Sequence, residues 1–251
     1  HAGDMSAGAG KGCGEGCYEM GGNNPGMGFA EWCRERAMGG TCRSVCAECC
    51  QVCRGTERVY VERSIFDEFV ARFSEQAKQM KLGVPEDPET DMGPLVSHEH
   101  QRKVLSYYEK AKEEGATVVL GGGVPDMPGE LANGAWVEPT IWTGLPDDAS
   151  VVTEEIFGPC CHIRPFDTEE EVIELANSLP YGLAAAVWTE NTSRALRVSG
   201  QIECGICWVN SWFLRDLRTA FGGSKQSGIG REGGVHSLEF YTEMKNICIK
   251  L

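Results

Sequence analysis

Hydrophobic and polar positions change regularly from residue 58 to the end of the chain. Residues 58–62 alternate with the two-residue period of a strand, and the residues after them place apolar side chains at helical spacing. Ser64 is expected to cap this helix and Gly83 to end it. The predicted apolar face of the helix consists of Ile65, Phe66, Phe69, Val70, Phe73 and Ala77.

Strand-like and helix-like segments continue to alternate after this helix. Further helices are predicted over 97–114, over 192–199, and after a capping box formed by Thr168 and Glu171. Further strands are predicted over 117–120, 136–142, 162–166, 181–189 and 205–210. Strands separated by helices indicate an α/β fold with a mainly parallel sheet that helices cover on both faces. Residues 240–251 are predicted as one more strand, exposed enough to pair with a neighbouring chain.

The first 53 residues differ from the rest of the chain, because they hold eight of its 13 cysteines. Residues 1–18 have neither helical nor strand periodicity, which predicts an irregular Gly-rich segment. The chain is long, its cysteine count is odd, and no signal peptide is recognisable at its start. We therefore expect reduced thiols and a cytoplasmic protein.

Charge narrows the class of partner. The formal net charge of −14 works against binding to nucleic acid or to an anionic membrane, since both would require clustered Lys and Arg. No apolar run approaches the roughly 18 residues of a membrane span. Small molecules are the expected partners.

Three separate segments carry the candidate chemistry. The first is a Gln-Val-Cys sequence that ends at Cys53, the second is Glu19-Met20-Gly21-Gly22, and the third is the Glu-Glu-Ile-Phe-Gly-Pro sequence over 154–159. Together they supply a thiol nucleophile, a carboxylate able to activate water, and a second carboxylate able to bind a ribose. The three segments resemble the aldehyde dehydrogenase superfamily.

The resemblance implies a covalent mechanism. Cys53 would be the nucleophile that attacks the aldehyde, and its pKa is expected to be lowered. Glu19 would be the base that activates water for hydrolysis of the thioester. The family usually has Lys where this chain has Asn23, which puts local cofactor or turn contacts in doubt. NAD is the implied cofactor, with Glu155 binding the nicotinamide ribose and Phe157 lying beside the nicotinamide.

The segment over 208–232 is the longest match to the family pattern and also bears on the substrate. It is very similar to the corresponding part of the 2-hydroxymuconic semialdehyde dehydrogenases and their 2-aminomuconic relatives, which act on aldehydes with a distal carboxylate. Arg215 matches the carboxylate-binding arginine of that group, and Phe221 is expected in the substrate site. Arg215 could instead form an ion pair with Asp216 or Glu232.

The resemblance covers only the C-terminal half of such proteins. We therefore expect a fragment with three parts: an irregular segment over 1–18, a catalytic domain over 19–220, and a return to a remnant of the NAD-binding domain over 221–251 that ends in an oligomerisation strand. The family's catalytic domain has three layers. The implied reaction is oxidation of a semialdehyde in aromatic catabolism by a homodimer or homotetramer. Hydride transfer by the fragment alone is expected to be very weak.

Two alternatives remain open. The spacings Cys46-x-x-Cys49 and Cys50-x-x-Cys53 could supply four thiols to a metal ion or an iron–sulfur cluster. With no loop between the two pairs, however, such a short segment could not easily surround one ion. The second alternative is a truncated, inactive subunit that retains only its oligomer contacts.

Overall fold

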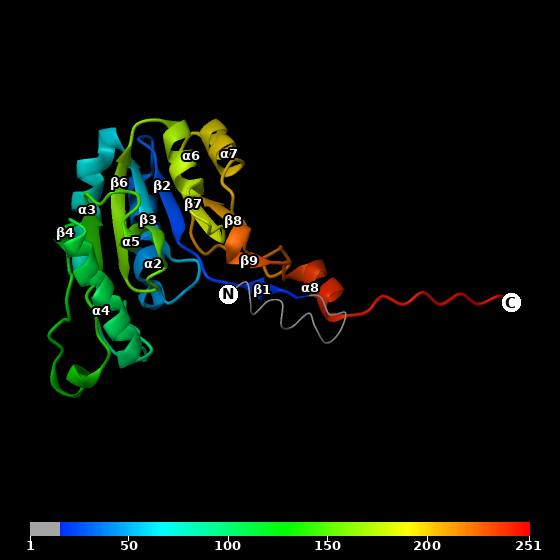
Figure 1. The fold of residues 1–251 in the computed structure, drawn as a ribbon, viewed down its shortest axis with the longest axis horizontal. Coiled ribbons are helices and arrows are strands. Elements are labelled where there is room, and N and C mark those ends of the chain that lie inside the picture. Colours follow the sequence, from blue (N-terminus) through cyan, green and yellow to red (C-terminus); the bar gives the residue numbers. More distant parts are fainter. Residues whose placement is uncertain (1–15) are drawn as a thin grey trace.

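The computed structural model describes residues 16–251, and a mixed seven-stranded sheet lies at its centre (Figure 1). The strands are β2 (Asn24–Gly28), β3 (Thr56–Glu62), β4 (Thr117–Leu120), β5 (Thr140–Thr143), β6 (Cys160–Phe166), β7 (Ala184–Trp188) and β8 (Ile206–Val209). Their order across the sheet is β4-β5-β6-β3-β2-β7-β8. Only the edge strand β4 runs antiparallel to its neighbour, so the expected α/β fold with a mainly parallel sheet is confirmed.

Helices cover both faces of this sheet. They are α2 (Arg34–Cys46), α3 (Phe66–Lys78), α4 (His98–Glu113), α5 (Ser150–Thr153), α6 (Glu169–Asn177) and α7 (Thr192–Ser199), whereas α8 (Gly234–Tyr241) lies outside these layers (Figure 1). Short 3-10 turns occupy Ala47–Cys50, Arg63–Ile65, Gly129–Asn133 and Lys225–Ser227. Helices α2, α3 and α4 share one hydrophobic core with the sheet, and α6 and α7 share a second core on the opposite face. The chain therefore has the three layers that the resemblance implied.

The two cores follow from the alternation of side chains along each strand. In β3, Val59 and Val61 join the core beneath α2, α3 and α4, whereas Tyr60 between them joins the core beneath α6 and α7. Strand β2, inside the sheet between β3 and β7, reads Asn-Pro-Gly-Met-Gly, and the Cβ that Gly26 lacks would lie 3.0 Å from the Thr56 methyl. Its small residues thus allow close packing of β2 against β3.

Helix and strand boundaries agree in part with the sequence. The helices over 97–114 and 192–199 and the strands over 58–62, 117–120 and 162–166 are confirmed. The Thr168 hydroxyl accepts from the Glu171 amide, as the capping box predicts, but the Glu171 carboxylate accepts from the Asp167 amide (2.8 Å). The strand expected over 136–142 is shorter and begins only at Thr140.

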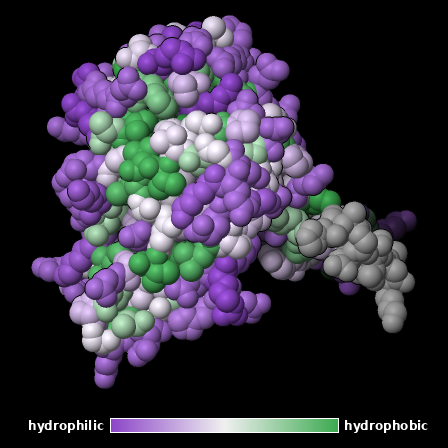
Figure 2. Space-filling view, turned by 60° about the vertical axis from the view of Figure 1, so that its left-hand side comes forward, coloured by the Kyte–Doolittle hydropathy of each residue, from purple (hydrophilic) through white to green (hydrophobic). Residues whose placement is uncertain are grey.

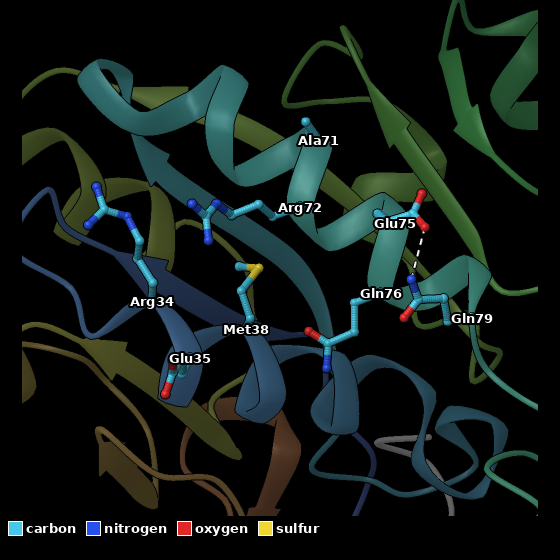
Figure 3. A pocket seen from close by; sticks show the side chains of 8 residues that line it. All are labelled: Arg34, Glu35, Met38, Ala71, Arg72, Glu75, Gln76 and Gln79. Atoms are coloured by element: carbon cyan, nitrogen blue, oxygen red, sulfur yellow. Dashed lines mark hydrogen bonds between the residues drawn. The ribbon is translucent and has the colours of Figure 1, made fainter.

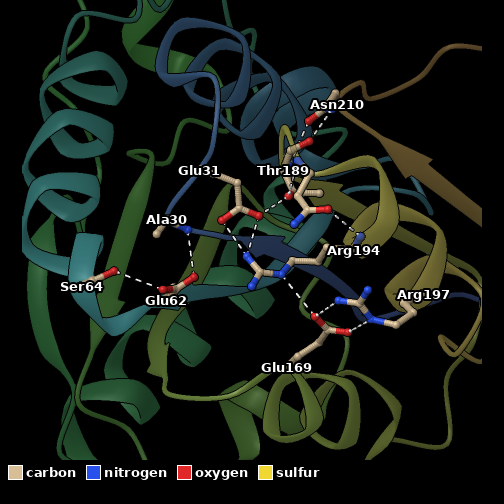
Figure 4. Close-up of polar contacts among 10 residues, drawn as sticks. Ala30, Glu31, Glu62, Ser64, Glu169, Thr189, Arg194, Arg197 and Asn210 are labelled. Carbon is tan, nitrogen blue, oxygen red and sulfur yellow. Dashed lines mark hydrogen bonds and ion pairs between the residues drawn. The ribbon is translucent and has the colours of Figure 1, made fainter.

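Ser64 was wrongly predicted as a helix cap. A 3-10 turn precedes α3, and the Ser64 hydroxyl donates to Glu62 Oε1 (3.3 Å) (Figure 4). The other oxygen of Glu62 accepts from the Ala30 amide (2.9 Å). Helix α3 also ends before Gly83, at Lys78.

A second, two-stranded sheet joins the start of the described chain to a segment near residue 228. Strand β1 (Tyr18–Glu19) pairs antiparallel with β9 (Gly228–Ile229), and α8 follows (Figure 1). The strand expected over 240–251 is wrong for the single chain, because Phe240 and Tyr241 end α8 and residues 242–251 extend away without helix or strand. Its pairing with another chain stays a prediction, as do the domain limits at 19 and 221. Most of the segment over 1–18 lies outside the described residues.

The surface is largely hydrophilic, with separate apolar patches on the face that Figure 2 shows. Each helix within residues 16–251 is too short or too polar to cross a bilayer.

A network of ion pairs joins the layers at the carboxyl edge of the sheet (Figure 4). Arg194 of α7 donates to both carboxylate oxygens of Glu31 (2.5 and 2.6 Å) and to Glu169 of α6 (3.2 Å). The Arg194 side chain is 26% exposed, whereas that of Arg197, which also binds Glu169, is 54% exposed. Arg194 is therefore the better shielded of the two cations.

We expect Arg194→Met to lower the free energy of unfolding by about 1–3 kcal/mol, because it leaves Glu31 and Glu169 with one fewer charged donor. Urea denaturation would measure the loss, and Arg197→Met is the matched control, with an expected loss below about 1 kcal/mol. Equal losses in the two variants would contradict the special role of Arg194.

Candidate functional site

The candidate catalytic residues gather at the amino edge of the parallel strands, opposite the ion-pair network. Cys53 lies just before β3, Glu155 lies just before β6, and Glu19 lies in β1, ahead of β2. The amino ends of parallel strands share one edge, which brings these distant segments together. The charges of Glu19 and Glu155 both act on the Cys53 thiol.

Asn24 holds the nucleophile loop in place, a role that the sequence analysis missed. Its side-chain amide donates to the carbonyls of Cys53 (2.9 Å) and Gly55 (2.7 Å), while its Oδ1 accepts from the Ala184 amide (2.9 Å). The buried Asn24 therefore links the loop to β7 through the start of β2. Its position beside the Glu19 motif was the available signal.

Burial raises the pKa of the Cys53 thiol, and the Glu19 and Glu155 carboxylates raise it further. The neighbouring Arg54 guanidinium acts in the opposite direction. The expected lowering of this pKa is therefore not found. Cys53 rests as a thiol at neutral pH, so its reaction requires a base or added positive charge.

Glu19 is placed by contacts with the far end of the sequence. It pairs with Gly228, and the next amide, that of Met20, donates to the Ser227 carbonyl (2.8 Å). Partial burial and the Glu232 carboxylate raise the pKa of Glu19, while nearby guanidinium groups oppose the shift. A carboxylate with a raised pKa is a stronger base, as activation of water requires.

The two glycines that follow Glu19 and Met20 contact the Glu155 carboxylate. The Gly22 amide donates to Glu155 Oε1 (2.9 Å). Gly21 has φ +88°, and a Cβ there would collide with Glu155 Oε2. Burial raises the pKa of Glu155, and the Gly22 amide and the Lys103 charge counteract it. Because the Gly22 amide binds only one of its oxygens, the Glu155 carboxylate can still accept a hydrogen bond from a ribose hydroxyl.

Glu57 binds the backbone of the loop that carries Glu155, a role that the sequence analysis also missed. Its two carboxylate oxygens accept from the amides of Ile156 (3.0 Å) and Phe157 (2.9 Å). The Phe157 backbone is left-handed (φ 62°), and its carbonyl lies 2.7 Å from His100 Nε2. Glu57 is only 6% exposed, and burial raises its pKa to about 8.

This raised pKa predicts a pH dependence of stability. A carboxyl with a pKa of about 8 in the folded chain and about 4.5 in the unfolded chain contributes stability below pH 4.5 and loses it as pH rises through 8. Across that window the free energy of unfolding should fall by about 4 kcal/mol relative to Glu57→Gln, which cannot ionise. Urea denaturation at several pH values would measure the difference, and parallel curves for the two proteins would disprove it.

Arg215 is occupied by an acidic neighbour, one of the two alternatives that its sequence position allowed. Its Nη2 donates to Glu232 Oε1 (3.2 Å), and its guanidinium lies 4.6 Å from the centre of the Phe221 ring. Asp216 pairs with Arg218 instead. Phe221 is buried and exchanges two backbone hydrogen bonds with Glu232 (both 2.8 Å). A substrate carboxylate would therefore have to share Arg215 with Glu232.

The metal alternative has no support. Within residues 16–251, no three His, Cys, Asp or Glu side chains are grouped as a metal site requires. The Cys49 thiol donates to the Gly93 carbonyl (3.0 Å), while Cys50 is fully buried beside Gly55. The four thiols of the two spaced pairs thus do not share one centre.

An open hollow among the described residues lies away from this chemistry (Figure 3). It runs between α2 and α3, has a volume of about 700 Å³ and is lined by Arg34, Glu35, Met38, Ala71, Arg72, Glu75, Gln76 and Gln79. It contains none of the candidate catalytic residues.

Comparisons with known proteins agree with these motifs. The family model described as "Aldehyde dehydrogenase family" matches residues 4–247. A 2-hydroxymuconic semialdehyde dehydrogenase of Pseudomonas sp. (strain CF600) is 72% identical over 93% of this chain and 48% of its own length. A 2-aminomuconic 6-semialdehyde dehydrogenase of Pseudomonas sp. is 55% identical over 93% of this chain and 48% of its own length.

A solved structure gives the same result for the fold. The betaine aldehyde dehydrogenase of Staphylococcus aureus, in complex with NAD+, superposes with a TM-score of 0.87 at 39% identity, over 90% of this chain and 44% of its own. The chain spans about half the length of the curated relatives that it matches. Its assignment to their C-terminal half stays a prediction from the motifs. The chain belongs to the aldehyde dehydrogenase family.

Proposed function

We propose that this chain carries the catalytic residues for NAD-dependent oxidation of a carboxylate-bearing semialdehyde, of the 2-hydroxymuconic type, to the diacid. The observation that carries the proposal is the meeting of Cys53, Glu19 and Glu155 at one edge of the sheet. The relatives that share 70–72% of its residues are named for this substrate.

In the proposed reaction, the Cys53 sulfur bonds to the aldehyde carbon and the thiol proton passes to the aldehyde oxygen, which gives a thiohemiacetal. When bound, NAD supplies the acceptor for the hydride that leaves this carbon. The hydroxyl proton passes to solvent as the hydride leaves, and a thioester remains on Cys53. Glu19 then takes a proton from water, the resulting hydroxide attacks the thioester carbon, and the carboxylic acid leaves as the Cys53 sulfur is freed.

The residues that would hold NAD are those of the loop over 154–158. Glu155 would accept from the nicotinamide ribose, and Phe157 would lie against the nicotinamide. Glu57 and His100 fix the backbone of this loop. These contacts preorganise the loop, which lowers the entropic cost of cofactor binding.

We also propose that Arg215 and Phe221 bind the distal end of the substrate. The working enzyme would be a cytoplasmic homodimer or homotetramer that acts in aromatic catabolism. The acidic composition favours small molecules over nucleic acid or an anionic membrane as binding partners.

Limiting iodoacetamide at neutral pH, followed by peptide mapping with and without NAD, tests the proposal. We expect Cys53 to react before the buried cysteines and NAD to change its rate. Uniform slow labelling of many cysteines, unaffected by NAD, would contradict the proposed site.

A further inference from the structure

Arg54, the residue after the candidate nucleophile, lies between aromatic rings. Its guanidinium carbon is 4.4 Å from the centre of the Phe213 ring and 5.3 Å from that of Phe221. The Arg54 carbonyl accepts from Trp212 Nε1 (3.1 Å). These contacts hold a flexible side chain beside the thiol at a reduced entropic cost.

The hydrogen-bonding capacity of Arg54 is incompletely used. Among the residues that the structure describes, its buried Nε has no hydrogen-bond partner, and the side chain makes no ion pair. A buried, unpaired guanidinium donor is costly unless a ligand satisfies it. Arg215, by contrast, already has Glu232.

Two guanidinium groups thus share one aromatic ring. Arg54 and Arg215 lie 5.3 and 4.6 Å from the centre of Phe221, and both charges act on Glu19. Two guanidinium groups near one ring favour a bound anion, and planar guanidinium groups match a carboxylate.

We propose that Arg54 acts together with Arg215 to bind the carboxylate of the substrate beside Cys53. The inference rests on the proposed function and adds a specificity residue to it. The substrate carboxylate would accept hydrogen bonds from Arg54, whose Nε is otherwise unpaired. Its binding would then not depend on Arg215 alone, whose charge Glu232 partly neutralises. A neutral aldehyde would leave both arginines without this partner.

Alkylating reagents with and without a carboxylate test the inference without NAD or turnover. Iodoacetate and iodoacetamide differ only in charge near the reacting carbon. Iodoacetylglycine and its amide place the same difference farther away. The measured quantity is the ratio of the Cys53 alkylation rates for the anionic and neutral reagents, read from peptide masses and divided by the same ratio for a small free thiol.

We expect Arg54→Leu to lower this normalised ratio by about fivefold or more for at least one reagent pair, because an Arg–carboxylate interaction is lost. Arg54→Lys keeps the charge but not the planar fork, so an intermediate ratio is expected. Arg36→Leu, on the exposed side of α2, removes the same charge far from the motif and should leave the ratio unchanged. Circular dichroism would show whether each variant is folded.

The two proposals fail in different ways. If Cys53 alkylation is preferential but Arg54→Leu slows the anionic and neutral reagents equally, Arg54 acts only on the thiol and the inference is overturned. An unchanged rate for both reagents overturns it as well. Loss of preferential labelling of Cys53 in the unaltered chain would instead overturn the proposed function. If Arg54→Leu does not fold, the ratio for Arg54→Lys decides, and a value equal to that of the unaltered chain contradicts the inference.

Discussion

Replacement of Cys53 by alanine is expected to remove the acylation of this chain by p-nitrophenyl acetate. This activated ester needs a nucleophile but no hydride acceptor, so it isolates the thiol step from NAD. Because Cys53 is the proposed nucleophile and Glu19 the proposed base, we expect a rapid first release of p-nitrophenolate. In Cys53→Ala its rate should fall by about a hundredfold or more.

Cys248→Ala is the matched control, because this thiol is exposed and lies far from the site in sequence. Its removal should lower only the slow background reaction. A burst that survives in Cys53→Ala would place the nucleophile elsewhere. The unaltered chain should also react faster as pH rises above 9, since the pKa of Cys53 is raised above that ordinary value.

Replacement of Glu19 by glutamine is expected to separate the two halves of the reaction. Attack by a thiolate formed at high pH should continue, whereas hydrolysis of the acyl-thiol should slow by about 10²–10⁴-fold, because glutamine cannot take a proton from water. Intact-mass measurement should then show the acetyl group accumulating on Cys53. Glu35→Gln, an exposed carboxylate on α2, should hydrolyse the acyl group at the unaltered rate.

The pH profile gives a further test of Glu19. The pKa of this carboxyl is raised above its ordinary value of 4.5. On acidification, the rate of acyl-thiol hydrolysis should therefore begin to fall at a pH higher than 4.5. Glu232→Gln removes a charge that contributes to the shift, and the acid limb should move to lower pH. An unmoved limb would show that another group titrates.

The sequence predicted most of the helices and strands from residue 58 onward, but not β2 and α2 before it. From residue 58 onward, apolar periodicity matches the helices and strands because each buries one face against the sheet. Strand β2 and helix α2 were not predicted. β2 is rich in Gly and Pro, which strands normally avoid, and only packing between β3 and β7 makes it an interior strand of the sheet.

The candidate site, like the fold, could be predicted from the sequence only in part. The motifs around Cys53, Glu19 and Glu155 were recognisable from the sequence alone, because covalent chemistry demands particular residue types in fixed local contexts. The contacts around these motifs could not be predicted, because they join residues far apart in the sequence. They are those of Glu57 with the loop over 154–158, of Asn24 with the nucleophile loop, and of Arg54 with aromatic rings.

The sequence by itself determined the alternation of elements, the family motifs and the identity of the candidate groups. Only the tertiary structure decided their ionisation and pairing. Burial raised the pKa of Cys53, where the family resemblance had implied the opposite, and Glu232 occupied Arg215. The physical reason is that periodicity and motifs are local properties of the chain, whereas desolvation and charge pairing depend on which distant segments meet.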